Sequence, residues 1–348
     1  MIHPALDGAG VTLALRPPAR VLVTGSAGFI GRHLVRQLTS AGYVVHGLDK
    51  ASTGWTNNAY VEHVGDILQD NWLSTTVQAV APDAVIHLAA RTDLDETRDI
   101  RGYAANIDGV ENLLRAIGNT ASVKRVVCTS SQLVCRMGHT PAHDQDYLPT
   151  TLYGASKVET ERLWRAADGA GREWCLVRPT TIWGPGMNPH YLTFFALVRD
   201  GRYFHIAGGP TPKTFGYVGN TVRQFQCLLE AASEQVHQRT FYLADSPQIS
   251  LEQWADAFRV ALNAGRIRTM PRWMARSLAR TGDAISALGV RFPFTTFRLN
   301  NVMTPSVVAL EATNEVCGKS PIDFTSAVDV TAAWCKRVWA GEPRWAID

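Results

Sequence analysis

Short apolar runs alternate with segments of helical periodicity along the first half of the chain. From Phe29 to Ser40 the apolar residues recur with the period of a helix, and the preceding run from Arg20 to Thr24 is typical of a buried strand. The same alternation predicts strands at 20–24, 43–48, 60–64, 84–88, 124–129 and 174–177, and helices at 29–40, 100–117 and 152–167. Repeated strand–helix alternation predicts an α/β fold with a doubly wound parallel sheet, covered by helices on both faces.

The chain is less regular after Arg178. Helices are expected at 189–200, 221–232, 251–264, 271–288 and 324–339, and short strands at 203–206 and 214–218. Segment 240–243 is typical of one more strand that returns to the main sheet. We therefore expect a flexible lead-in at 1–19, a main domain at 20–180 with a returning segment near 214–245, and a smaller lobe built from 181–213 and 246–348.

The composition makes several classes of protein improbable. Of the 348 residues 46% are hydrophobic, which is enough for a sizeable core, and a net charge of +3 is too small for nucleic-acid binding to be expected. The six cysteines include no CxxC pair and the histidines have no ligand-like spacing, so neither a disulfide framework nor a metal site is predicted. No apolar run is long enough to span a membrane and segment 1–20 lacks the pattern of a signal peptide, so we expect a cytoplasmic protein.

Gly25, Gly28 and Gly31 form a GxxGxxG pattern between the first predicted strand and the first predicted helix. In this context the backbone turns tightly, and the helix directs its N–H groups and positive dipole end at a pyrophosphate. Asp49 follows the next strand, where a carboxylate would accept the ribose hydroxyls of NAD and repel the 2′-phosphate of NADP. Lys50 beside it favours a phosphate, but the pattern as a whole predicts a dinucleotide site that prefers NAD.

Tyr153 and Lys157 form a YxxxK pattern at the start of a predicted helix, which puts the phenol and the ammonium on one face. A nearby ammonium and the positive charge of an oxidised nicotinamide would lower the phenol pKa from its usual ~10, making Tyr153 a base for a hydroxyl proton. Ser130 and Ser131 follow a predicted strand at the sheet edge where ligands bind, so one of them could hydrogen-bond the reacting oxygen. Taken singly, these residues fit a surface pair and a polar strand cap equally well.

Five motifs occur in the order in which a known family has them. They are Thr24-Gly-Ser-Ala-Gly-Phe-Ile-Gly31, His87-Leu-Ala-Ala90, Ser130-Ser131, Tyr153-Gly-Ala-Ser-Lys157 and Arg178-Pro-Thr-Thr-Ile-Trp-Gly-Pro185. With these motifs the chain resembles the extended short-chain dehydrogenase/reductase superfamily, in its NAD-dependent nucleotide-sugar epimerase/dehydratase branch, over nearly its whole length from Arg20. The resemblance implies a Rossmann-type NAD-binding domain at 20–180, with the smaller lobe binding the substrate.

The resemblance also implies functions for individual residues. Ser131, Tyr153 and Lys157 match the catalytic residues, and Ser131 is preferred to Ser130 because it begins an S-x-x-V pattern. The residues expected at the cofactor are Gly25, Gly28, Phe29, Ile30, Gly31, Asp49, Asp66, Ile67, Leu88, Ala89, Ala90, Asn106, Tyr153 and Lys157. The residues expected at the substrate are Arg91, Ser131, Thr181, Lys213 and Arg298.

Three departures from the family pattern bear on the reaction. Gln132 and Leu133 stand where family dehydratases carry an acid pair, so a dehydratase is not expected. Thr181 replaces an asparagine near the nucleotide-sugar phosphates. Lys213 replaces an arginine and loses its bidentate fork. A different nucleotide, or a substrate that is not a nucleotide sugar, therefore stays open.

The resemblance implies an NAD-dependent epimerase of carbohydrate biosynthesis, similar to a UDP-sugar 4-epimerase. Tyr153 would take the proton of a sugar hydroxyl and Ser131 would steady the transient ketone, while NAD takes the hydride and returns it on the other face. One alternative is an NAD(P)-dependent dehydrogenase or reductase of a steroid-like or phenolic carbonyl compound. Another is a non-catalytic NAD-binding sensor, against which the intact Ser131, Tyr153 and Lys157 argue.

Two helical segments bear on partners. The apolar stripe at 100–117 and the resemblance together imply a homodimer, although packing on the sheet explains much of the stripe. The segment Trp273–Leu288 is basic and amphipathic, which fits either a membrane surface or a helix packed on the smaller lobe. We favour the packed helix.

Overall fold

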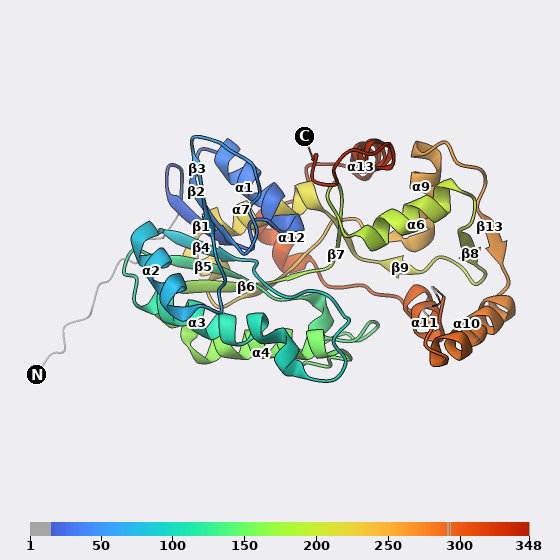
Figure 1. The fold of residues 1–348 in the computed structure, drawn as a ribbon, viewed down its shortest axis with the longest axis horizontal. Coiled ribbons are helices and arrows are strands. Elements are labelled where there is room, and N and C mark those ends of the chain that lie inside the picture. The colour runs from blue at the N-terminus through green and yellow to red at the C-terminus, as the bar shows by residue number, and fades with distance from the viewer. Residues whose placement is uncertain (1–14, 291, 293, 348) are drawn as a thin grey trace, which may run out of the picture.

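The computed structural model describes residues 15–290, 292 and 294–347, so most of the expected lead-in lies outside the described residues. Figure 1 shows two parts side by side, with the main sheet and its helices on the left and the smaller lobe on the right. Strands β7 and β9 lie between the two parts. Within the described residues no helix is long and apolar enough to cross a membrane.

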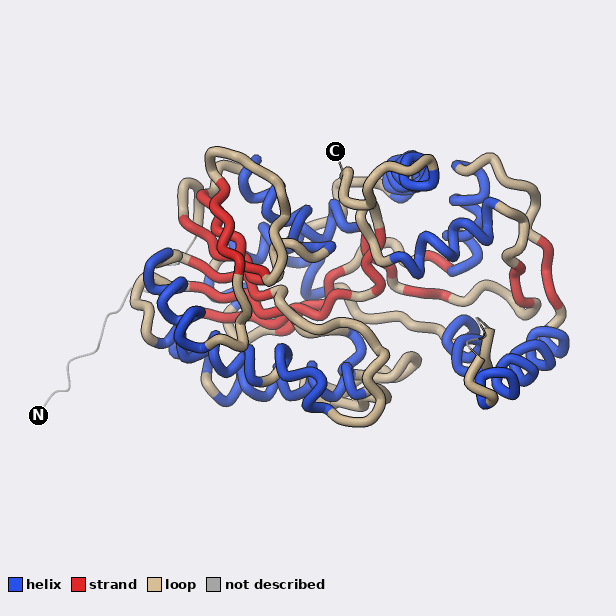
Figure 2. Tube along the Cα trace, in the orientation of Figure 1, coloured by secondary structure: helices blue, strands red, loops and turns tan. Residues whose placement is uncertain are grey.

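The main sheet has seven strands in the order β11–β6–β5–β4–β1–β2–β3, and every pair is parallel. Figure 2 shows them as one twisted sheet with helices on both sides of it. The strands are β1 Arg20–Thr24, β2 Val44–Asp49, β3 Tyr60–Val64, β4 Ala84–His87, β5 Arg125–Thr129, β6 Glu173–Pro179 and β11 Thr240–Leu243. The doubly wound α/β fold is confirmed, and so is the return of segment 240–243 to the sheet edge beside β6.

Helices cover both faces of this sheet because successive strand residues point to opposite sides. Val21 and Val23 pack with α1 and α7, whereas Leu22 packs with α2 and α3 on the other face. The helices of this domain are α1 Phe29–Ser40, α2 Asp70–Val80, α3 Asp108–Gly118, α4 Leu152–Ala166, α5 Asp168–Gly171, α7 Val218–Glu230 and α8 Ser233–Val236, with short 3₁₀ turns at Ile100–Asn106 and Gln132–Val134.

The single helix expected at 100–117 is wrong, because the chain forms a 3₁₀ turn at 100–106 and then kinks into α3. The Asn106 carbonyl accepts a hydrogen bond from the Thr160 hydroxyl at 2.6 Å, and its side-chain amide bonds the backbone of Arg91. These partners lie far along the chain, so the periodicity could not reveal the break. The apolar side of α3 is buried against the sheet, which accounts for the stripe, and the homodimer stays a prediction.

The smaller lobe is built from helices around an aromatic cluster in which Trp183, Trp254 and Phe258 pack edge to face. Its helices are α6 Pro189–Arg199, α9 Leu251–Ala261, α10 Arg272–Ala287, α11 Thr296–Met303 and α13 Phe324–Trp339. Its short strands are β7 Thr181–Trp183, β8 Phe204–Ile206, β9 Pro212–Lys213, β10 Phe215–Tyr217, β12 Ile249–Ser250 and β13 Arg268–Met270. Helix α12, Glu311–Cys317, packs instead on α7 and β11 of the main domain.

Candidate active site

The glycine loop packs against the carboxyl end of β4. Gly25 has a positive φ of 73°, and a Cβ there would lie 2.6 Å from the backbone nitrogen of Ala89. A Cβ on Gly31 would lie 2.1 Å from the Gly25 carbonyl oxygen. Only glycine fits at both positions, so the loop leaves an open cradle at the N-terminus of α1, where a pyrophosphate can approach the backbone.

Asp49 closes one side of this cradle from the end of β2. Its carboxylate accepts hydrogen bonds from the backbone N–H of Ala27 at 3.0 Å and of Ala51 at 3.1 Å. These bonds fix the carboxylate beside the glycine loop, with Lys50 next to it on the cavity wall.

A cavity of about 750 Å³ runs from the glycine loop to the start of the smaller lobe. Its volume is that of a site for a large organic ligand. Asn106 does not line it; it is buried and holds the backbone of Arg91 from behind. The other residues predicted at the cofactor all line the cavity: Gly25, Gly28, Phe29, Ile30, Gly31, Asp49, Asp66, Ile67, Leu88, Ala89, Ala90, Tyr153 and Lys157.

Ser131, Tyr153 and Lys157 meet on one wall of the cavity. Helix α4 begins at Leu152 because the Thr151 hydroxyl accepts the N–H of Gly154 at 3.0 Å, so Tyr153 and Lys157 lie in its first two turns. Ser131 caps the 3₁₀ turn that follows β5, because its hydroxyl accepts the N–H of Leu133 at 3.1 Å. The same hydroxyl is hydrogen-bonded to the Tyr153 phenol.

Burial dominates the electrostatics of this wall. It raises the pKa of Tyr153 to about 12, and the hydrogen bond with Ser131 only partly opposes this. Burial also lowers the pKa of Lys157. The YxxxK pattern suggests a lowered pKa for the Tyr153 phenol, but in the protein without cofactor this pKa is raised. Lowering it would need the positive charge of a bound nicotinamide.

The Ser130 hydroxyl is used in a buried hydrogen-bond network and not at the cavity. Its hydroxyl donates to Glu161 at 2.6 Å, and Glu161 forms a buried ion pair with Arg178 at 2.8 Å. This network ties β5, α4 and β6 together behind the cavity. It agrees with the preference for Ser131 that the sequence pattern suggested.

The residues predicted at the substrate separate into two groups. Arg91 and Thr181 line the cavity together with Ser131, and the Arg91 guanidinium is held by Asp93 and the carbonyl of Gly102. Lys213 and Arg298 do not line it. The Lys213 ammonium donates to the carbonyls of Asn301 at 2.6 Å and Thr304 at 2.5 Å, at the C-terminal end of α11.

Asn188 and Tyr191 are among the residues of the cavity wall that the sequence analysis missed. Asn188 caps the N-terminus of α6 with its side chain, and Tyr191 follows in the first turn, hydrogen-bonded to Thr181. The sequence Asn188-Pro-His carries the signal of a helix start, but nothing local indicates that this start faces the cavity.

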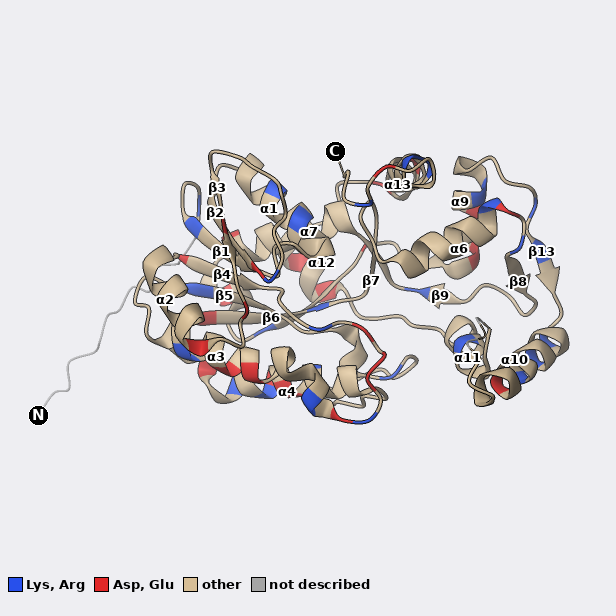
Figure 3. Cartoon of the chain, in the orientation of Figure 1, with Lys and Arg blue, Asp and Glu red and all other residues tan. Residues whose placement is uncertain are grey.

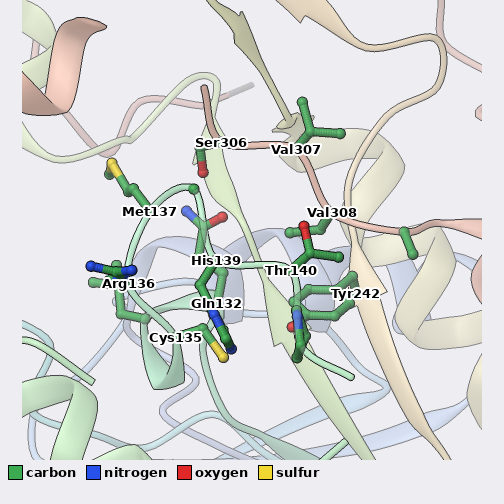
Figure 4. Close-up of a pocket in the computed structure, with 14 residues that line it drawn as sticks. Gln132, Cys135, Arg136, Met137, His139, Thr140, Tyr242, Ser306, Val307 and Val308 are labelled. Atoms are coloured by element: carbon green, nitrogen blue, oxygen red, sulfur yellow. The ribbon is translucent and has the colours of Figure 1, made fainter. Parts of the chain in front are cut away.

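A second, small pocket of about 90 Å³ adjoins the large cavity. It is mostly apolar and lies between the loop after Cys135 and the segment 306–309 that follows α11, as Figure 4 shows. Gln132, Leu133 and Met137 line both spaces, so the two lie on either side of these side chains.

The fold and the site define an enzyme class that uses a dinucleotide cofactor, with a hydroxyl, a phenol and an ammonium placed for redox chemistry at a carbon–oxygen bond. A family model described as the NAD dependent epimerase/dehydratase family matches residues 21–244. The chain belongs to this family, which confirms an NAD-dependent enzyme. Over the described residues, no group of three or more His, Cys, Asp or Glu side chains is arranged to hold a metal ion.

Curated relatives act on different substrates. The chain is 33% identical, over 68% of its length and 67% of the relative, to a 3 beta-hydroxysteroid dehydrogenase/Delta 5→4-isomerase of Mycobacterium tuberculosis. It is also 27% identical to an N-acetyl-alpha-D-glucosaminyl-diphospho-ditrans,octacis-undecaprenol 4-epimerase of Escherichia coli O157:H7. This match covers 70% of the chain and 72% of the relative.

Solved structures share the fold at low identity. A UDP-glucose 4-epimerase of Thermotoga maritima has a TM-score of 0.71 at 20% identity, over 92% of this chain and 99% of that chain. A UDP-glucuronic acid 4-epimerase of Bacillus cereus has a TM-score of 0.72 at 18% identity over the same shares. These similarities confirm the predicted fold.

Proposed function

We propose that this enzyme is an NAD-dependent dehydrogenase that oxidises an uncharged, ring-bearing secondary alcohol, such as a 3-hydroxysteroid, to the ketone. The observation that carries the proposal is the charge of the cavity wall. Among the described residues that line the large cavity, the cationic side chains are Lys50 beside Asp49, Lys157 beside Tyr153, and Arg91, which Asp93 neutralises. The wall around Gln132, Thr181 and Tyr191 therefore suits a neutral substrate.

The apolar pocket under segment 306–309 supports the same proposal. Met137, Val307 and Val308 line it beside the substrate end of the cavity, together with the polar side chains of Arg136 and His139. A small alkyl group of the substrate, rather than its ring system, fits a pocket of about 90 Å³ and gains free energy there in proportion to the apolar area it buries. The identity to a steroid dehydrogenase agrees with this substrate class.

The cofactor residues fit NAD in this proposal. Gly25, Gly28 and Gly31 leave room for the pyrophosphate, Asp49 accepts the adenosine ribose hydroxyls, and Asp66 and Ile67 flank the adenine. The carboxylate at Asp49 disfavours a 2′-phosphate by charge repulsion. When bound, NAD accepts the hydride from the carbinol carbon.

The chain's own residues handle the proton and the oxygen. The Tyr153 phenolate accepts the hydroxyl proton of the substrate, and the Ser131 hydroxyl donates a hydrogen bond to the oxygen as it becomes a carbonyl. Lys157 stabilises the phenolate across one helical turn and orients the nicotinamide ribose. The net reaction releases a ketone, NADH and one proton.

The second candidate is an NAD-dependent epimerase acting on a nucleotide-diphosphate sugar, with the ketone reduced again before release. Arg91 and Thr181 on the cavity wall favour it, as does the identity to an undecaprenol-linked sugar 4-epimerase. The diphosphate of such a substrate would not be bound by Lys213 or Arg298, because neither residue lines the cavity.

The deciding experiment incubates the purified protein and NAD with two panels, one of 3-hydroxysteroids and one of UDP-, GDP- and dTDP-sugars. NADH release is followed together with chromatography of the products. We expect ketosteroid and NADH in equal amounts from the first panel and no new sugar from the second. A new sugar isomer without net NADH would replace the proposal with the epimerase, and bound NAD without any turnover would favour the non-catalytic sensor.

A further inference from the structure

Helix α10 carries three different faces. Ala275, Ala279 and Gly282 are buried, and they pack on α11 and on neighbouring apolar side chains. Arg272, Arg276 and Arg280 follow one another at four-residue spacing and form an exposed arginine stripe. The remaining face is an apolar stripe.

The apolar stripe consists of the exposed Met274 and Leu278 and the half-buried Ile285, which share one side of the helix with the exposed Thr281 between them. Trp273 lies between the two exposed stripes and is 69% exposed. The end of the helix and α11 add Leu288, which is 83% exposed, and Phe297, which is 60% exposed. Single exposed apolar residues are ordinary, but a group of this size at one end of a molecule marks an interaction surface.

The charge of the same region is strongly one-sided. Segment 266–298 contains seven arginines and one aspartate, a net charge of +6, whereas the whole chain has +3, so the remainder carries a net charge of −3. Figure 3 shows the basic positions on α10, on α11 and on the chain leading into β13, at the end of the molecule farthest from the main sheet. Asp283 is already engaged, because it accepts the backbone N–H and the hydroxyl of Thr296.

The exposed stripes are not needed to hold the two helices together. A Cβ on Gly282 would lie 2.0 Å from the Phe294 carbonyl oxygen, so α10 and the segment before α11 are in backbone contact there. Ala275, Ala279 and Leu299 complete a small buried cluster. Arg272 donates to the carbonyls of Ala207 at 2.7 Å and Gly208 at 3.3 Å and so also ties α10 to the chain before β9. Arg276, Arg280 and the large apolar side chains lie outside the buried cluster that fixes the helix pair.

We propose that this end of the smaller lobe docks on an anionic lipid membrane, with α10 lying in the plane of the membrane surface. We define the docking surface as Arg272, Trp273, Met274, Arg276, Leu278, Arg280, Leu288 and Phe297. An amphipathic helix with arginines beside an apolar stripe, and an indole between them, suits the boundary between headgroups and acyl chains. The apolar stripe enters the acyl boundary while the arginine stripe pairs with lipid phosphates.

A second copy of this chain fits the surface poorly. A two-fold contact would place the same patch on both sides, so the two arginine stripes would lie close together and repel each other. The acid on this helix, Asp283, already accepts a hydrogen bond from the N–H of Thr296. Lipid phosphates supply the negative charge that a second copy lacks.

Docking on a membrane would also bring the substrate end of the cavity close to the bilayer. From α11 the chain runs directly into segment 306–309, which walls the apolar pocket beside the large cavity. An alcohol dissolved in the bilayer would then be taken up near the pocket that receives its hydrocarbon part. The docking surface itself does not depend on the proposed substrate, and vesicle binding is measured without turnover.

The test is flotation of the full chain with two kinds of vesicle, phosphatidylcholine alone and phosphatidylcholine mixed with phosphatidylglycerol. We expect binding to the mixed vesicles that weakens as salt is added, and little binding to phosphatidylcholine alone. Replacing Arg272, Arg276 and Arg280 by Gln should lower the affinity for mixed vesicles by about 100-fold. Replacing Trp273 and Leu278 by Ser should lower it by about 10-fold or more.

Each variant has a matched control elsewhere on the surface. Arg101→Gln, Arg162→Gln and Arg223→Gln remove the same charge from other exposed sites, and Val61→Ser with Val330→Ser removes exposed apolar side chains. These controls should bind vesicles as the unmodified chain does, and all variants should keep its thermal unfolding. The proposal is overturned if mixed vesicles do not bind, if the controls lose as much affinity as the test variants, or if sedimentation shows that the surface holds two copies together.

Discussion

Tyr153 is the residue on which the proposed chemistry depends, and its surroundings hold it protonated. Burial raises its pKa to about 12, while Ser131 provides the single hydrogen bond that lowers it. At neutral pH the phenol of the protein alone is therefore neutral. In the proposed reaction the positive charge of a bound oxidised nicotinamide would lower the pKa of Tyr153, so that proton removal would depend on the presence of the oxidised cofactor.

Replacing Tyr153 by Phe tests this directly. We expect kcat to fall by about 10²- to 10⁴-fold while the Kd of NAD changes little, because the ring still fills its place but takes no proton. Tyr103→Phe is the matched control, since the Tyr103 phenol lies nearby with its ring centroid 6.0 Å from that of Tyr153 but donates to the Asp93 carbonyl. Steady-state kinetics and NAD titration separate the two effects, and a fully active Tyr153→Phe would remove the proposed base.

We expect Asp49 to determine the preference between NAD and NADP. Asp49→Ser should shift the ratio of kcat/KM for NAD over NADP towards NADP by about 10-fold or more, because the repelling carboxylate is gone while Lys50 remains. Lys50→Ser in the same background should reduce the gain. An unchanged ratio in Asp49→Ser would mean that the carboxylate serves only to hold the glycine loop through Ala27 and Ala51.

Single residues of the site differed in how well the sequence revealed them. The glycines, Asp49, Tyr153 and Lys157 were recognisable because local spacing within one loop or one helical turn fixes their geometry. Lys213 was not, because its partners at Asn301 and Thr304 lie about 90 residues further along the chain. No local pattern distinguishes a lysine that caps a distant helix from one that reaches a diphosphate.

At the scale of elements, Lys213 joins β9 to the end of α11. A helix leaves its last carbonyls without partners inside the helix, and the Lys213 ammonium satisfies those of Asn301 and Thr304. The bridge also positions segment 306–309, since Thr214 donates its N–H to Ser306 at 2.8 Å. Helix α11 was not expected from the sequence, and neither were these contacts, because its eight residues carry a weak periodic signal.

Lys213→Met should therefore lower the free energy of unfolding by about 1–2 kcal/mol, because it leaves two partly buried carbonyls without this donor. Denaturant unfolding measures this, with the exposed Lys319→Met as the control. If Lys213 instead held a substrate diphosphate, the KM for a nucleotide sugar would rise while stability stayed the same.

The long helices of both parts were predicted well, whereas α2 of the main domain and α11 and most short strands of the smaller lobe were missed. Strand β1 and helix α1 have the expected bounds, because a buried strand followed by an amphipathic helix is specified by its own residues. The break at Asn106 depends on Thr160 and Arg91, and the two-residue strands β9 and β12 form only by pairing with each other. Tertiary partners of this kind leave no periodic pattern in the sequence.

At the scale of the whole molecule, the two parts are joined at the junction after β7. His33 on α1 hydrogen-bonds the carbonyl of Pro185 in this junction at 2.8 Å, and burial lowers the pKa of its ring to about 4. Since this value lies below the ordinary 6.5, the stabilisation by the neutral ring is complete above pH 6.5 and is lost as the pH falls towards 4.

His33→Gln tests this junction, because glutamine can still donate to Pro185 but cannot become charged. Between pH 6.5 and 4 the unmodified protein should lose up to about 3 kcal/mol of stability relative to the variant. Denaturant unfolding at several pH values gives the difference. Parallel stability curves for the two proteins would show that His33 is not held neutral.

The most direct test of the proposed dehydrogenase follows the hydride itself. The protein is incubated with NAD and a 3-hydroxysteroid that carries deuterium on the carbinol carbon, and the products are analysed by mass spectrometry. We expect the deuterium on the nicotinamide ring of released NADH, one per ketone formed, and none with Tyr153→Phe. NADH without deuterium would contradict net oxidation of an uncharged alcohol at this site. So would a steroid that keeps its deuterium while a nucleotide sugar, offered in a parallel incubation, reacts.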